Sequence, residues 1–188
     1  LSKEKFKEKI LIGTSCNSLN DTVDIIQHSI KAGFKNFLTM NVAYYKNEDS
    51  GVYSFYKNII KFAPEAKIIL YNFSKLSGYA FTPEVTKKLI KDFPKNIVGM
   101  KDSTGNLWEN FKAENFSMFV GSEKKLLDGL RVGAVGCISA TTNVTGSLAK
   151  KVFDDFHKNR NSSDDSKLKA LRTVFDDTGN LISALHTL

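Results

Sequence analysis

The regular alternation of short apolar runs with amphipathic stretches most constrains the fold of this chain. Six such runs cover residues 9–15, 36–40, 67–73, 96–102, 117–122 and 135–140. Most of them are nearly continuous in hydrophobicity, which is typical of strands that are buried on both faces. Strands that alternate with helices predict an α/β fold in which right-handed crossovers join parallel strands.

The stretches between the runs carry helix start signals. Asn20 or Asp21 can cap the first helix, and Ser122 can cap a later one. Thr82 followed by Pro83 is a strong signal, because proline is favoured at the first helical position. Each apolar run is therefore expected to lead into a helix.

Two architectures fit repeated strand–helix units, an open doubly wound sheet and a (β/α)8 barrel. A doubly wound nucleotide-binding protein would carry G-x-G-x-x-G or a P-loop after a strand, and this sequence has neither. Polar residues stand instead at the carboxyl ends of the runs, where barrel enzymes place their chemistry. This pattern favours the barrel. Six strands do not close an eight-stranded barrel, however, and such barrels typically run to about 250 residues.

No further strand is expected after residue 140, and the segments 146–159 and 165–186 read as helices. We therefore expect residues 1–145 to form a partial barrel and residues 146–188 to form a C-terminal helical extension.

Composition and charge exclude several classes of protein. The net charge is +7, but only three of the 27 basic residues are arginine, the residue that bidentate base and phosphate recognition prefers. No apolar run approaches the roughly 20 residues that span a bilayer. The three histidines lie on predicted helices and suggest no metal site, and two cysteines are too few for a disulfide framework. These features predict a cytoplasmic protein without a nucleic-acid or membrane partner.

Lys101 and Tyr71 are the candidate catalytic residues. Each stands at the carboxyl end of an apolar run, and the two runs are consecutive. Burial disfavours the ammonium form of a lysine, and a neutral amine can attack a ketone to form a Schiff base. A phenol beside that amine can relay protons. The alternatives are a lysine that reaches out to solvent and a tyrosine that packs a barrel layer.

Tyr44 and Tyr45 follow the run at 36–40 and bring two more phenols to the same rim. They fit a catalytic or substrate-binding role and an interface pair about equally well.

The motifs YNFSKLSGY, IVGMKDSTGN, FVGSEKKLL and GAVGCISATTNV, in this order, resemble the dihydrodipicolinate synthase/N-acetylneuraminate lyase superfamily. The resemblance runs from about residue 9 to the end of the chain. It implies a (β/α)8 barrel with extra C-terminal helices that forms homo-oligomers. It also implies condensation of pyruvate with an aldehyde, or the reverse cleavage, through a lysine Schiff base without a metal or organic cofactor.

The resemblance assigns a role to each matching residue. Lys101 would form the Schiff base, Tyr71 would relay protons, and Tyr45 would reach into the site of a neighbouring subunit. Gly121 and Ile138 would line the pyruvate pocket. Tyr44, of the tyrosine pair at the rim, is a further candidate substrate-binding residue.

The chain also departs from the family pattern. The family's G-G-T-T-G-E motif is absent, so the resemblance implies a barrel without its first two strands. The YN motif usually continues to a proline, where Ser74 stands here. The synthases carry an arginine for the carboxylate of the aldehyde at the position of Leu76. Asn41 and Val42 replace a proline pair.

Leu76 favours a lyase that acts on a 2-keto-3-deoxy sugar acid or a related 2-keto acid and releases pyruvate and an aldehyde. The alternative within the family is 4-hydroxy-tetrahydrodipicolinate synthase, which joins pyruvate to aspartate semialdehyde. A truncated, inactive barrel that acts as a binding or assembly partner is the alternative of another class.

Overall fold

The computed structural model describes residues 4–187, which form two compact units, one up to Ser117 and one from Met118. The expected division into 1–145 and 146–188 stays a prediction, and residues 1–3 and 188, which it includes, lie outside the described part. None of the described helices is long and apolar enough to cross a bilayer.

The first unit contains three strand–helix units and a fourth strand, with two short helices in addition. Its elements are η1 (Glu4–Lys9), β1 (Leu11–Gly13), α1 (Leu19–Lys31), β2 (Asn36–Thr39), α2 (Asp49–Phe62), β3 (Lys67–Asn72), α3 (Ser74–Ser77), α4 (Pro83–Asp92) and β4 (Ile97–Asp102). The helix expected after the run at 96–102 is wrong, because β4 leads into a loop without a helix. The four strands pair in chain order and every pair is parallel, as the alternating pattern predicts.

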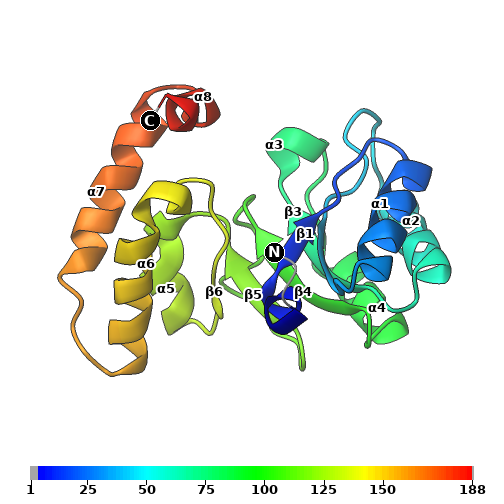
Figure 1. Ribbon diagram of the computed structural model, residues 1–188, viewed down its shortest axis with the longest axis horizontal. Helices are drawn as coiled ribbons and strands as arrows, with labels where there is room; N and C mark the ends of the chain where they lie inside the picture. Colours follow the sequence, from blue (N-terminus) through cyan, green and yellow to red (C-terminus); the bar gives the residue numbers. More distant parts are fainter. Residues whose placement is uncertain (1–3, 188) are drawn as a thin grey trace. The chain divides into compact units, whose positions relative to one another are not determined.

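Helices α1, α2 and α4 cover one face of this sheet (Figure 1). Phe37, Ile68, Leu70 and Met100 point to that face, and none of them is exposed to solvent. The Tyr56 hydroxyl of α2 donates a hydrogen bond to the Thr39 carbonyl at 2.8 Å, so the helix is tied to the strand end as well as packed on it. Residues that alternate with these, among them Tyr71, point to the other face.

The helix caps agree with the sequence at two of three positions. Thr82 accepts a hydrogen bond from Val85 N with Pro83 at the start of α4, and Ser122 accepts one from Lys124 N. The first expected cap is wrong. The cap of α1 is Ser18, whose side chain accepts from Asp21 N, so the helix begins before both Asn20 and Asp21.

The second unit holds two strands and a group of helices. Its elements are β5 (Ser117–Val120), whose first residue belongs to the first unit, η2 (Glu123–Lys125), α5 (Leu126–Arg131), β6 (Gly136–Cys137), α6 (Thr142–His157), α7 (Asp164–Asp177) and α8 (Leu181–His186). β5 and β6 pair in parallel. α6 lies between α5 and α7 (Figure 1), around a core that includes Leu130, Val152 and Leu168.

Helix α5 approaches β5 closely because residue 129 is a glycine. A Cβ at Gly129 would lie 2.6 Å from Val120 Cγ1, which is closer than packed carbon atoms come. The expected helix 165–186 is interrupted, since α7 ends at Asp177 and α8 begins at Leu181. Gly179 between them has φ +71°, a backbone conformation that favours glycine and ends the helix.

Candidate functional site

Lys101 and Tyr71 are neighbours across β3 and β4. The two residues form a register pair of the parallel ladder, and the Lys101 Nζ lies 4.0 Å from the centroid of the Tyr71 ring. Lys101 is only 8% exposed. The buried amine therefore lies against the face of the Tyr71 ring. The structure thus brings together the two residues that the sequence places at consecutive strand ends.

The Tyr71 ring is held from a second side. It stacks on Phe73, with a centroid distance of 5.9 Å and an angle of 27° between the rings. Among residues 4–187, no hydrogen bond occupies the Tyr71 hydroxyl, so the phenol can bond to another molecule. These contacts fix the Tyr71 ring, and they leave its hydroxyl group able to exchange a proton with a bound molecule.

A buried polar cluster backs this pair on the opposite face of the strands. Asn72 and Asp102 directly follow Tyr71 and Lys101, and the Asn72 Nδ2 donates to the Asp102 Oδ1 at 2.9 Å. Both residues are buried. The sequence places them at strand ends, but it gives no sign that they bond to each other.

Tyr44 and Tyr45 lie on the loop between β2 and α2 and are 85% and 64% exposed. Their rings meet edge to face at 5.6 Å. The Asn47 Nδ2 holds the loop by donating to the carbonyls of Val42 at 2.8 Å and Tyr45 at 2.9 Å. In the part of the chain that the structure describes, no ring contact or hydrogen bond joins either tyrosine to Lys101.

The start of α2 is clamped to the segment before α4. The two oxygens of Asp49 accept hydrogen bonds from the Tyr79 hydroxyl at 2.6 Å and the Thr82 hydroxyl at 2.5 Å. Burial and the nearby Asp49 carboxylate both raise the pKa of Tyr79 well above its usual value. The clamp therefore holds a neutral phenol, and it fixes the end of the loop that carries Tyr44 and Tyr45.

In the second unit, Gly121 and Ile138 follow the paired ends of β5 and β6. Val120 and Cys137 form the last register pair, and Ile138 N donates to the Val120 carbonyl at 3.0 Å. Both Gly121 and Ile138 are half-buried. The structure thus places these two predicted pocket residues at neighbouring strand ends.

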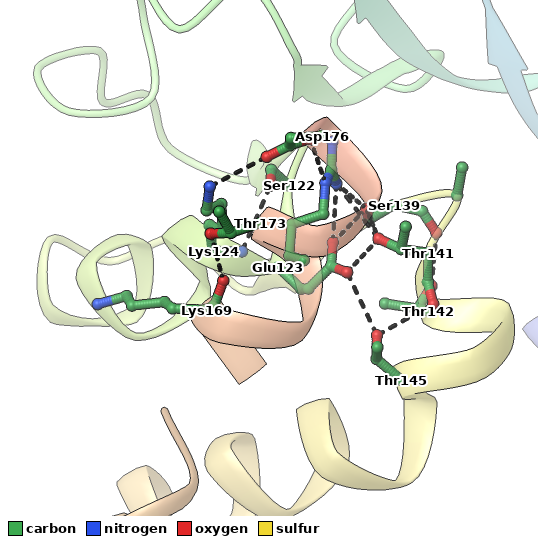
Figure 2. A network of polar contacts seen from close by, with 12 residues as sticks. Ser122, Glu123, Lys124, Ser139, Thr141, Thr142, Thr145, Lys169, Thr173 and Asp176 are labelled. Atoms are coloured by element: carbon green, nitrogen blue, oxygen red, sulfur yellow. Dashed lines mark hydrogen bonds and ion pairs between the residues drawn. The ribbon is translucent and has the colours of Figure 1, made fainter. Parts of the chain in front are cut away.

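A network around Glu123 follows Gly121 in the chain (Figure 2). The Glu123 side chain is fully buried, and the hydroxyls of Ser139 and Thr141 donate to it. Arg172 of α7 donates from Nη1 to the Glu123 Oε2 at 3.0 Å, and Thr145 adds a longer hydrogen bond of 3.2 Å. One buried carboxylate therefore connects the ends of β5 and β6 to two helices.

The surroundings of Glu123 stabilise its charged form. Burial alone would raise the pKa of this carboxyl, but the hydroxyls of Ser139 and Thr141 and the Arg172 guanidinium together hold the pKa below its usual value. Sequence reasoning missed this network because the partners of Glu123 stand 16 to 49 residues further along the chain. The only signal is an acidic residue directly after an apolar run.

Among the described residues, no three His, Cys, Asp or Glu side chains gather as a metal site would require.

Residues 2–181 match the Dihydrodipicolinate synthetase family. A 4-hydroxy-tetrahydrodipicolinate synthase of Bartonella bacilliformis is 32% identical over 149 residues, which cover 77% of this chain and 50% of the relative. The chain spans about half the length of the curated relatives that it matches.

Solved structures match the fold at low sequence identity. DHDPS from Cyanidioschyzon merolae gives a TM-score of 0.75 at 23% identity, over 85% of this chain and 55% of that one. The 2-keto 3-deoxygluconate aldolase from Picrophilus torridus gives 0.73 at 24% identity, over 80% and 55%. These matches confirm the predicted α/β fold, a partial (β/α)8 barrel of six strands with C-terminal helices.

Proposed function

Because the chain belongs to the dihydrodipicolinate synthetase family, we propose that it is a lyase that bonds pyruvate to Lys101 as a Schiff base. The observation that carries the proposal is the Lys101 Nζ, which is buried 4.0 Å from the centre of the Tyr71 ring. An amine held at this place can act as a nucleophile toward a ketone.

In the proposed reaction, the neutral amine of Lys101 attacks the ketone carbon of pyruvate and forms a carbinolamine. Protonation of the carbinolamine hydroxyl and its loss as water then give the protonated imine. The imine withdraws electrons, so the adjacent methyl group loses a proton and becomes an enamine carbon that adds to an aldehyde. The reverse sequence cleaves a 2-keto acid into pyruvate and an aldehyde. Neither direction requires a metal or an organic cofactor.

Tyr71 is proposed as the group that moves protons to and from the carbinolamine oxygen. Its hydroxyl has no partner among the described residues, and its ring contacts both Phe73 and the Lys101 amine. A fixed phenol within reach of the reacting oxygen supplies general acid–base catalysis.

Gly121 and Ile138 are proposed to line the pyruvate pocket, with Tyr44 as a further substrate-binding residue. Tyr45 is proposed to assist the site of a second copy in a homo-oligomer. Its 64% exposure in the described chain leaves the ring available for such a contact.

The proposed substrate is a 2-keto-3-deoxy sugar acid or a related 2-keto acid. Leu76 lies on α3 with 56% exposure, at the position where the resemblance places an arginine in the synthases. A leucine offers no cationic partner to the carboxylate of aspartate semialdehyde. Leu76 thus disfavours aspartate semialdehyde as the aldehyde.

The second candidate is 4-hydroxy-tetrahydrodipicolinate synthase activity, which the 32% identity to the Bartonella bacilliformis protein favours. Parallel assays separate the two candidates. One follows pyruvate release from 2-keto-3-deoxy sugar acids, and the other follows pyruvate consumption with aspartate semialdehyde. Consumption only with aspartate semialdehyde would replace the first candidate with the second.

The common step is tested by incubating the protein with pyruvate and borohydride and then measuring its intact mass. We expect a gain of one reduced pyruvyl group in the native chain and none in Lys101→Arg. The exposed Lys88 supplies the matched control, because Lys88→Arg should leave the gain unchanged. Absence of any adduct would favour the inactive, partner-binding barrel.

A further inference from the structure

Asn72 and Asp102 end β3 and β4 as a register pair, one residue beyond Tyr71 and Lys101. Side chains alternate along a strand, so this second pair lies on the face opposite the proposed reacting groups. The hydrogen bond from the Asn72 Nδ2 to the Asp102 Oδ1, at 2.9 Å, joins the two strands directly behind the Tyr71–Lys101 contact.

Both oxygens of the Asp102 carboxylate accept hydrogen bonds from N–H donors. Its Oδ1 also accepts from Gly105 N at 2.8 Å, and its Oδ2 accepts from Leu107 N at 2.8 Å and Trp108 N at 2.9 Å. A buried carboxylate with several such donors has one strongly favoured position. Asp102 therefore anchors the loop that follows β4 and fixes its own place on the strand.

Asn72 is held as firmly on the other strand. Its Oδ1 accepts from Phe81 N at 3.1 Å and from the Thr104 hydroxyl at 3.2 Å. Its Nδ2 donates to the Asn106 Oδ1 at 2.8 Å as well as to Asp102. The side chain thus connects β3 to the segment before α4 and to the loop after β4.

The ladder between β3 and β4 needs such an anchor because it is irregular. Ile68 pairs with Ile97 and Ile69 pairs with Gly99, so the register shifts between them. A one-residue slip exchanges the two faces of a strand, and here it would move Lys101 away from Tyr71. The contacts of Asn72 and Asp102 select one register beyond the irregularity.

We infer that Asn72 and Asp102 are positioning residues, whose hydrogen bond sets the register that puts the Lys101 amine over the Tyr71 ring. The contact between Lys101 and Tyr71 can be measured without turnover, so this part of the inference is independent of catalysis. Only its effect on the reaction rests on the proposed function.

The test is the NMR signal of the Lys101 ε-methylene in the full chain grown with ¹³C-labelled lysine. The aromatic ring should shift this signal upfield, and Lys101→Arg should remove the signal and so assign it. Asn72→Leu keeps the size of the side chain and removes its hydrogen bonds. We expect it to abolish the upfield shift and to slow pyruvate trapping.

The matched control is Thr14→Val. Thr14 and Thr39 share a buried hydroxyl–hydroxyl hydrogen bond of 2.8 Å at the ends of β1 and β2, away from the β3–β4 pair. We expect this variant to keep both the upfield shift and the trapping rate. Variants are compared only where circular dichroism shows that they are folded.

Thr104→Val keeps the test valid if Asn72→Leu does not fold, since it removes one of the hydrogen bonds to the Asn72 Oδ1. It should reduce the upfield shift. An unchanged shift in a folded Asn72→Leu protein, or in Thr104→Val when Asn72→Leu does not fold, would overturn the inference.

Two further results separate this inference from the proposed function. If native protein shows the upfield shift but no pyruvate adduct, the proposed function fails. The effect of Asn72→Leu on the upfield shift still tests the β3–β4 register. If Asn72→Leu acts through Tyr71, its effect on trapping should largely disappear in a Tyr71→Phe background. A merely structural effect would instead add to that of Tyr71→Phe.

Discussion

The Arg172 Nη1 donates a 3.0 Å hydrogen bond to the Glu123 carboxylate, which has no exposed surface. Arg172 lies on α7 and Glu123 begins η2, two residues after Gly121, so a helix late in the chain neutralises a charge near the Gly121 position. A buried ion pair is not in itself a large gain in stability, but the loss of one partner leaves an uncompensated buried charge.

Arg172→Met should therefore destabilise the protein strongly. Loss of the guanidinium leaves Glu123 buried without its cation, which costs about 3–5 kcal/mol. Urea unfolding followed by circular dichroism measures this change. Arg131→Met is the matched control, because the Arg131–Asp128 pair is solvent-exposed and should contribute less than about 1 kcal/mol. Equal effects of the two variants would contradict the role assigned to Arg172.

Glu123 should also make the stability depend on acid pH. Its pKa is lower in the folded state than in the unfolded state, so the folded state binds fewer protons. The resulting stabilisation is present above the unfolded pKa of about 4.3 and is lost as the pH falls through the folded pKa. The free energy of unfolding should thus decrease in acid, and Glu123→Gln should reduce that decrease.

Urea titrations at a series of pH values measure this dependence. The exposed Asp24 of α1 provides the control, because Asp24→Asn should change the acid dependence little. If Glu123→Gln keeps the full acid dependence of the native chain, Glu123 is not its source.

Gly99→Ala should destabilise the first unit. A Cβ at residue 99 would lie 2.5 Å from the Ser117 backbone oxygen, and backbone cannot move aside as a flexible side chain can. Overpacking of this kind typically costs about 1–3 kcal/mol. Gly51→Ala is the control, since a Cβ there in α2 meets no atom within 4 Å. It should stabilise the helix by about 0.5–1 kcal/mol, and thermal unfolding should show opposite shifts for the two variants.

Tyr71→Phe should slow the proposed reaction by about 10²–10⁴ without unfolding the chain, because it removes the phenol that relays protons. The ring contact with Lys101 does not require the hydroxyl and should persist. The rate of borohydride trapping with pyruvate measures the effect. A rate equal to that of the native chain would remove Tyr71 from proton transfer.

The sequence predicts the order and type of most elements, because buried parallel strands and amphipathic helices leave different periodicities. The topology then predicts that Tyr71 and Lys101 meet, since consecutive parallel strands end at the same edge. Competition between neighbouring capping residues explains the wrong prediction for the start of α1. Ser18, Asn20 and Asp21 are all good caps, and only the tertiary structure selects Ser18.

The hydrogen-bond networks could not be predicted in the same way. Glu123 meets Arg172 from 49 positions away, and Asn72 meets Asp102 from 30 positions away. Such pairs leave no periodic signal, because each depends on how separate elements pack. The sequence shows the polar residues at the strand ends but not the partners that fix them.

The central claim is that Lys101 is the residue that bonds pyruvate, and the most direct measurement is the position of the reduced adduct within the digested protein. The native chain, reduced with borohydride in the presence of pyruvate, should carry the pyruvyl group on the peptide that contains Lys101. An adduct confined to other lysines, or an unmodified Lys101 peptide from protein shown to be folded, would contradict this account.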